Sequence, residues 1–88
     1  MTYRIEFRPA AFRDLGRLDQ AVREKIAANI DSLGQDPRPP GVEKLQRRDK
    51  RYRLRIGAYR VIYEIEDEVL LVLVVRIGHR REVYRLKS

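Results

Sequence analysis

The spacing of hydrophobic residues changes from strand-like to helix-like near the start of the chain. Residues 3–7, YRIEF, alternate apolar and charged side chains, which is the pattern of a strand with one buried face. After Pro9, apolar residues recur at Phe12, Leu15 and Leu18. This spacing predicts a short helix that buries all three side chains on one face.

A second helix is predicted between Asp19 and Gly34. Asp19 suits the N-cap position, and Gly34 is well placed to end the helix. Apolar residues between them recur at helical spacing, at Val22, Ile26, Ile30 and Leu33. Two successive helices with one apolar face each predict a helical hairpin that lies on a sheet.

Residues 35–50 interrupt both patterns. The stretch QDPRPPGVEKLQRRDK contains three prolines and a glycine, which predict a loop. Its two hydrophobic residues are Val42 and Leu45, and we expect them to anchor the loop to the rest of the protein.

From Tyr52 onward, the alternation of a strand returns in YRLRI and again in YRVIYEI. Gly57-Ala58 separates these stretches and suits a two-residue type II′ turn. A turn near Asp67 then leads into the apolar run at residues 69–75, which is typical of a strand buried on both faces. We therefore predict an α+β fold: an N-terminal strand, a helical hairpin and a three- to four-stranded, mainly antiparallel sheet.

Length and composition limit the class of protein. The 88 residues suffice for one domain, 1–88, with a single core. There is no cysteine, which excludes disulfides and thiolate metal sites. The longest apolar run falls far short of the roughly 20 residues that cross a bilayer, so we expect a cytoplasmic protein without a membrane partner.

Positive charge is concentrated in the second part of the chain. Lysine and arginine number 20 against 13 acidic residues, a net charge of +7, and only four of the 20 are lysine. Residues 36–88 hold 14 of the basic groups and 8 of the acidic ones. Because the guanidinium fork suits phosphate, this bias indicates a nucleic acid or another acidic partner. The alternative is a basic surface that is merely solvated.

The predicted hairpin gathers three arginines on one face. With Gly57-Ala58 as the loop, Arg55 stands directly across from Arg60, and Arg53 lies on the same face two residues along. Like charges opposite each other destabilise a sheet, so the arrangement indicates a bound anion. Two alternatives remain open: the arginines extend into solvent, or a three-residue loop shifts the register and sends Arg60 to the other face.

The C-terminal stretch RIGHRREVYR adds further candidate residues. Gly78 permits a change of direction after the last strand, which we expect to bring His79, Arg80 and Tyr84 to the rim of the arginine-bearing face. Histidine transfers protons near neutral pH, arginine stabilises charge on a pentavalent phosphate, and tyrosine stacks on a base or donates its hydroxyl. This set is adequate for RNA cleavage in which the ribose 2′-hydroxyl attacks the adjacent phosphate.

Each of these residues has a simpler interpretation. His79 can be an inert side chain of an exposed turn, and Tyr84 can pack against the core. One histidine and no cysteine offer no cluster with metal-ligand spacing, so we expect neither a metal nor another cofactor.

The order of a strand, a helical hairpin, a proline-rich loop and then YRLRIGAYRVIYEIEDEVLLVLVVRIGHRREVYR resembles the RelE/ParE toxin superfamily of toxin-antitoxin modules, and within it RelE. RIGAYRVIYEI and GHRREVY are its most specific parts. The resemblance implies a fold related to microbial ribonucleases and a ribosome-dependent, metal-independent endonuclease that cleaves mRNA in the A site and inhibits translation. It also implies a RelB-like antitoxin as partner, through which alone operator DNA is contacted.

The resemblance further implies roles for individual residues. Arg60 matches the arginine that grips the scissile phosphate, Arg80 the arginine after the last long strand, and Tyr84 the tyrosine that orients the base or the nucleophile. Arg53 and Arg55 fall where the family often has lysines, one of which can serve as general base. Arginine stays protonated, so this chain departs from that pattern.

The base is then expected to be His79 or Tyr84, unless charge stabilisation and ribosomal positioning suffice. The basic residues expected to contact RNA are Arg53, Arg55, Arg60, Arg80, Arg81, Lys44, Arg47 and Arg48. Two other functions fit the same residues: a ParE-like toxin that inhibits DNA gyrase, and a nucleic-acid-binding domain without catalysis.

Overall fold

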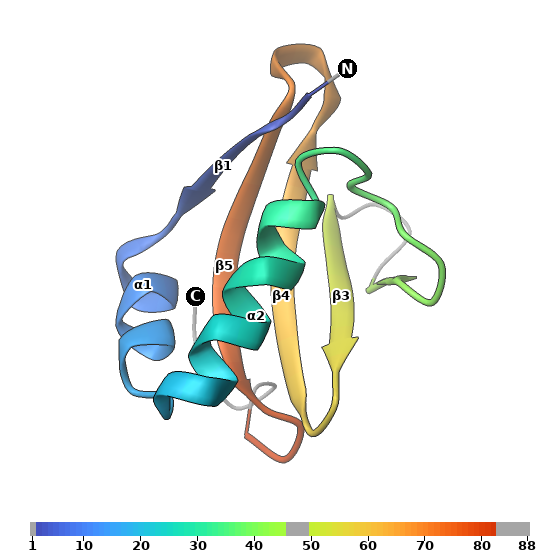
Figure 1. Ribbon diagram of the computed structural model, residues 1–88. Helices are drawn as coiled ribbons and strands as arrows, with labels where there is room; N and C mark the ends of the chain where they lie inside the picture. Colours follow the sequence, from blue (N-terminus) through green and yellow to red (C-terminus); the bar gives the residue numbers. More distant parts are fainter. Residues whose placement is uncertain (1, 46–49, 83–88) are drawn as a thin grey trace.

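Within residues 2–45 and 50–82, which the computed structural model describes, five strands form one sheet in the order β1-β5-β4-β3-β2 (Figure 1). The strands are β1 (Arg4–Phe7), β2 (Glu43–Lys44), β3 (Arg51–Ile56), β4 (Tyr59–Glu66) and β5 (Leu71–His79), and the helices are α1 (Pro9–Gly16) and α2 (Gln20–Ser32). β1 runs parallel to β5, and the other neighbouring strands are antiparallel. The predicted α+β fold is confirmed, with the short β2 as an unpredicted addition.

The hydrophobic core lies between the helices and one face of the sheet, here called the helix-covered face. In Figure 1, α2 crosses in front of the strands, and α1 lies near the end of β1. Ile26 and Ile30 of α2 are fully buried against Val61 and Tyr63 of β4 and Val74 of β5. No helix in the described part of the chain is long and apolar enough to span a membrane.

The buried stripe of α1 differs from the predicted one. Phe12 is 67% exposed, and its ring meets the Phe7 ring in a T-shaped arrangement with centroids 6.4 Å apart. Ala11 and Asp14 are buried instead, and Leu15 packs against the core. Residues 11, 14 and 15 are three and one positions apart, so their side chains share one face of the helix. Phe12 follows Ala11 directly and therefore points about 100° away from it. The prediction that Phe12 is buried was wrong, since a polar residue occupies the stripe.

The ends of α2 match the predicted positions by a different mechanism. Asp19 is the N-cap residue, but its side chain makes no capping hydrogen bond. The helix ends at Ser32, and Gly34 does not have a positive φ. Gly34 is instead a point of close approach: its carbonyl accepts the Tyr3 N–H at 2.7 Å, and a β-carbon there would lie 3.1 Å from the Tyr3 carbonyl oxygen.

The apolar run at residues 69–75 is only partly a strand. Val69 lies in a 3₁₀ turn and is 59% exposed, Leu70 has a left-handed φ of 52°, and β5 begins at the next residue. Val75 is an extra residue in the β4–β5 pairing, which shifts between Ile62 and Tyr63. The expectation of one strand across the whole run was therefore wrong at its start.

The proline-rich loop is anchored as predicted. Val42 packs against the main core, and Leu45 packs against Ile62 and Val75 on the opposite face of the sheet. Val42 and Leu45 therefore pack on opposite faces of the sheet. The two residues between them in the sequence form β2, which pairs with β3.

Candidate nucleic-acid interface

The tight turn between β3 and β4 has the predicted geometry. Gly57 has a φ of 59°, whereas Ala58 is not in the left-handed region, which is the pattern of a type II′ turn. Ile56 pairs with Tyr59 in register, so the loop has two residues. This excludes the three-residue loop that would have shifted the register.

The consequence is an arginine cluster of Arg53, Arg55, Arg60 and Arg80. Arg55 and Arg60 are direct cross-strand partners. Desolvation lowers the pKa of Arg60, and the positive charges of the other three arginines lower it further, while the charge of Glu43 acts in the opposite direction. The four guanidinium groups therefore form one electrostatic site on the face opposite the helices, here called the arginine face.

Backbone groups hold two members of the cluster. Arg60 donates from Nη1 to the carbonyl oxygens of Tyr59 at 3.1 Å and Gly57 at 3.4 Å. The Arg80 N–H donates to the Ala58 carbonyl at 2.7 Å, which places Arg80 beside the turn just after β5 ends. Within residues 2–45 and 50–82, no carboxylate forms an ion pair with either arginine or with Arg55.

The other end of the arginine face is neutralised. Arg51 Nε lies 2.9 Å from Glu64 Oε2, and Arg8 Nη2 lies 3.8 Å from the same oxygen. Lys50 Nζ lies 2.9 Å from Glu66 Oε2. Positive charge without a carboxylate partner thus gathers at the end of the sheet that carries the tight turn.

Arg53 stands between these two regions. It pairs in register with Glu43 of β2, and its Nη2 forms an ion pair with Glu43 Oε2. One member of the arginine cluster therefore has a carboxylate beside it, on an accessible side chain that is 62% exposed.

His79 lies on a different face from the arginine cluster. It pairs with Tyr59 in register, and the two rings meet edge to face with centroids 5.7 Å apart. Tyr59 packs against the main core, so His79 faces the helices, where it lines a cavity of about 260 Å³ together with Leu18. The expected placement at the rim of the arginine face was wrong, because β5 continues through Gly78 and side chains keep alternating.

The remaining predicted residues are scattered. Lys44 pairs with Tyr52, which belongs to the helix-covered face, so it lies away from the cluster. Arg81 is exposed, and its N–H donates to His79 Nδ1 at 3.2 Å. Three residues fall outside the described part of the chain: Arg47, Arg48 and Tyr84.

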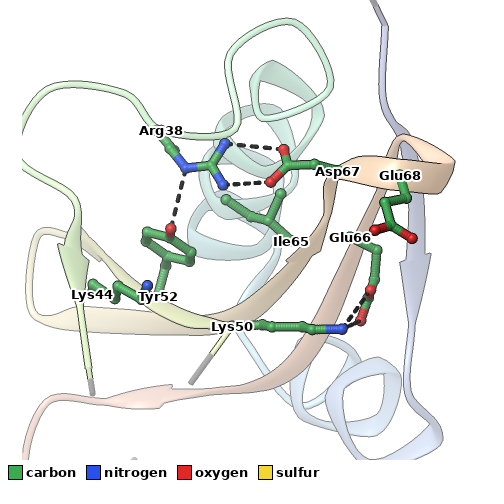
Figure 2. Close-up of a pocket in the computed structure, with 8 residues that line it drawn as sticks. All are labelled: Arg38, Lys44, Lys50, Tyr52, Ile65, Glu66, Asp67 and Glu68. Carbon is green, nitrogen blue, oxygen red and sulfur yellow. Dashed lines mark hydrogen bonds and ion pairs between the residues drawn. The ribbon is translucent and has the colours of Figure 1, made fainter. Parts of the chain in front are cut away.

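A second concave site has a volume of about 340 Å³ and lies where the proline-rich loop meets the β4–β5 turn (Figure 2). Arg38 donates to both carboxylate oxygens of Asp67, at 3.2 and 2.8 Å, and to the Tyr52 hydroxyl at 3.1 Å. The Arg38 hydrogen bonds and one from the Tyr3 hydroxyl lower the pKa of Asp67 to about 2. Because Arg38 belongs to the proline-rich loop and Asp67 to the β4–β5 turn, their ion pair fixes the loop to this end of the sheet.

Two acidic residues with structural or electrostatic importance were not predicted. Asp14 accepts hydrogen bonds from Arg76 and from the Ile77 N–H, and its position on the stripe with Ala11 was the available signal. Glu43 sits in a two-residue strand, which is too short for any period to show.

Comparisons with known proteins place the fold in a family. A family model described as ParE toxin of type II toxin-antitoxin system, parDE, matches residues 5–84. The chain is 31% identical over 88 residues to the mRNA interferase toxin RelE of Escherichia coli (strain K12), a match that covers 96% of this chain and 92% of that protein.

Solved structures of toxin-antitoxin complexes contain chains with a similar fold. The toxin-antitoxin complex RelBE2 from Mycobacterium tuberculosis contains a chain with a TM-score of 0.81 and 28% identity, covering 91% of this chain and 100% of its own. A chain of the archaeal RelE-RelB complex from Pyrococcus horikoshii has a TM-score of 0.81 and 29% identity, and the match covers 91% of this chain and 97% of that one. Both the sequence model and these folds span nearly the whole protein. The chain therefore belongs to the RelE/ParE superfamily of type II toxin-antitoxin toxins.

Proposed function

We propose that this toxin is a ribosome-dependent mRNA endonuclease. The observation that carries the proposal is the cross-strand pair Arg55 and Arg60, flanked by Arg53 and Arg80, at the end of a sheet face whose other charges neutralise one another. Such a concentration of guanidinium groups destabilises an empty sheet and stabilises one that holds a phosphate. The likeness to an mRNA interferase of E. coli supports the choice of RNA.

The chemistry that fits this site is attack of the ribose 2′-hydroxyl on its own adjacent phosphate. Negative charge builds up on the phosphorane oxygens in the transition state, and positive groups fixed beforehand stabilise it. In this proposal Arg55 and Arg60, which are cross-strand partners, contact those oxygens, and Arg80, beside the same turn, binds the RNA further along. The arginines thus supply the charge for which other nucleases use a metal ion, and cleavage in the ribosomal A site stops translation.

We further propose that a RelB-like antitoxin neutralises this toxin in the cytoplasm. Structures similar to this chain are RelE-RelB and RelBE complexes. A partner that covers the arginine cluster should present acidic side chains to the guanidinium groups. It should also present apolar side chains to Leu45, which packs over the buried Ile62 and Val75 and is itself partly exposed. Neutralising Arg55 and Arg60 together should weaken such a complex, and an unchanged affinity would contradict this surface as the contact.

A second candidate function is inhibition of DNA gyrase. It is favoured by one observation, namely that the family model that matches residues 5–84 describes ParE toxins. A DNA supercoiling assay with purified gyrase distinguishes it from RNA cleavage.

The test of the main proposal is cleavage of 5′-labelled mRNA, with and without ribosomes paused at a defined codon. Wild-type protein should cut within the A-site codon only when the ribosome is present. Arg60→Ala should lose this activity, whereas Arg13→Ala, which removes the same charge from the exposed side of α1, should retain it. Intact mRNA with folded wild-type protein, together with inhibited supercoiling, would instead support the gyrase function.

A further inference from the structure

The arginine cluster lacks a proton acceptor of its own. Attack by a 2′-hydroxyl requires a group that removes its proton, and guanidinium groups remain protonated. His79, the one histidine of the chain, faces the helices. The tyrosines of the described residues pack in the helix-side core, and Lys50 is paired with Glu66. The remaining candidates for a base on the described part of the arginine face are therefore carboxylates.

Strand register places one carboxylate next to the cluster. Glu43, Arg53 and Ile62 lie across from one another on β2, β3 and β4, and Arg55 and Arg60 form the next row toward the tight turn. Rows two residues apart along a strand are separated by about 7 Å, which long side chains bridge. Glu43 is thus one row from the pair that is placed to hold the scissile phosphate.

The environment of Glu43 suits a base. Arg53 Nη2 binds Oε2 and orients the carboxylate, while 62% of the side chain stays accessible. Its charge reaches Arg60, because it opposes the three arginines that lower the Arg60 pKa. Among the described residues, the other carboxylates on this face are paired away from the cluster: Glu64 with Arg51, Glu66 with Lys50 and Glu6 with Arg4.

We propose that Glu43 is the general base of RNA cleavage, an inference that rests on the proposed function. The Glu43 carboxylate takes the proton of the 2′-hydroxyl as the O2′–P bond forms. The P–O5′ bond breaks, and the leaving 5′-oxygen takes a proton from water. The products are a 2′,3′-cyclic phosphate and a 5′-hydroxyl, so the step is balanced without a metal ion or an oxidant.

The experiment compares Glu43→Gln with wild type in single-turnover cleavage of ribosome-bound mRNA, across the pH range in which ribosomes stay intact. The matched control is Glu68→Gln, an exposed acidic residue of the β4–β5 turn. We expect Glu43→Gln to lower the rate by about 10²-fold or more, the usual contribution of a general base. Binding of mRNA with a 2′-deoxy nucleotide at the cleavage site should change by less than about threefold, since an ion pair in solvent contributes little.

The pH profile separates a base from a residue that only positions Arg53. The other charged groups of the described residues on this face are Arg51, Arg53 and Arg55 of β3, Arg60, Glu64 and Glu66 of β4, Arg4 and Glu6 of β1, and Arg8, Lys50 and Arg80 next to the ends of β1, β3 and β5. Arg76 of β5 lies across from Ile62 in the same row as Glu43, and its guanidinium is paired with Asp14. If Glu43 takes the proton, the wild-type rate should fall at acidic pH, and the Glu43→Gln rate should rise in proportion to hydroxide. If it only orients Arg53, the Glu43→Gln rate should drop equally at every pH, and the proposal is overturned.

Two further results would also overturn the proposal. Tighter binding with an unchanged cleavage rate in Glu43→Gln would show that Glu43 merely competes with phosphate for Arg53. In that case Arg60→Ala would still be inactive, and the proposed nuclease function would stand. Failure of wild type to cleave on the ribosome would instead remove both proposals together.

Discussion

Removing the Asp14 carboxylate is expected to destabilise the fold by about 3 kcal/mol, a value within the range for breaking buried ion pairs. Asp14 Oδ2 accepts from Arg76 Nε at 2.8 Å and from the Ile77 N–H at 3.0 Å, and Oδ1 accepts from Arg76 Nη2 at 3.0 Å. The side chains of Asp14 and Arg76 are only 7% and 14% exposed. One carboxylate therefore joins α1 to the edge of β5 beyond the end of β1.

The magnitude follows from what Asp14→Ala leaves behind. Loss of one partner of a buried ion pair costs about 3–5 kcal/mol, and a buried N–H without an acceptor costs about 1–3 kcal/mol. Arg76 keeps other interactions, and 14% of its side chain is exposed to water. We therefore expect a total of about 3 kcal/mol, the low end of the range for a broken buried ion pair. For a chain of this size, about 3 kcal/mol corresponds to a fall in Tm of about 12–24 °C.

The assay is urea unfolding followed by circular dichroism, with Arg60→Ala in every variant so that the toxin can be produced. Asp19→Ala is the matched control, because the Asp19 side chain makes no capping hydrogen bond, and it should change the unfolding free energy by less than about 0.5 kcal/mol. The unfolding free energy of Asp14→Asn should lie between those of Asp14→Ala and Asp19→Ala, because the asparagine amide oxygen can still accept the hydrogen bond from the Ile77 N–H. Equal stability of Asp14→Ala and Asp19→Ala would refute the reasoning.

Three further predictions concern stability. Hydrogen bonds from Arg38 lower the pKa of Asp67 from 3.8 to about 2, so the ionised Asp67 stabilises the fold at pH values above its unfolded-state pKa, and this stabilisation is lost as the pH falls through about 2. Arg38→Ala should therefore unfold at a higher pH in an acid titration. An unchanged midpoint would contradict the pairing. Tyr63→Phe loses the buried hydrogen bond to the Pro37 carbonyl at 2.7 Å and should cost about 1 kcal/mol in urea unfolding, more than Tyr52→Phe. Gly34→Ala places a β-carbon 3.1 Å from a carbonyl oxygen and should cost about 1–3 kcal/mol, whereas Gly16→Ala, with nothing within 4 Å, should not destabilise α1.

Features determined by local chemistry could be predicted from the sequence. The two-residue turn at Gly57 set the register that opposes Arg55 and Arg60, because few turns join two strands with that spacing. The alternation at residues 3–7 and the helical spacing from Val22 to Leu33 likewise depend on neighbours in the chain, and both are confirmed.

Features that depend on contacts distant in sequence could not be predicted. Asp14 is buried with its charge satisfied by Arg76 and the Ile77 N–H, which are 62 and 63 positions away. Phe12 lies on another side of the same helix and is exposed. His79 faces the helices because β5 remains regular through Gly78, although glycine would have permitted a turn. Glu43 lies beside the cluster because β2 pairs with β3, and a strand of two residues is too short to show an alternation in the sequence.

The division of charge on the arginine face explains how one small sheet can be both stable and ready to bind. In water, two unit charges about 4 Å apart repel each other by only about 1 kcal/mol, so the exposed end of the sheet tolerates Arg55 beside Arg60. A phosphate bound between the two guanidinium groups attracts both of them, and these two attractions outweigh the remaining repulsion. Any nucleic acid offers such a phosphate, however, so the arginines alone cannot select RNA. Cleavage, unlike binding, is restricted to RNA because only RNA carries the 2′-hydroxyl that attacks the phosphate. The proposed role of Glu43, one row from Arg55 and Arg60, is to activate that hydroxyl.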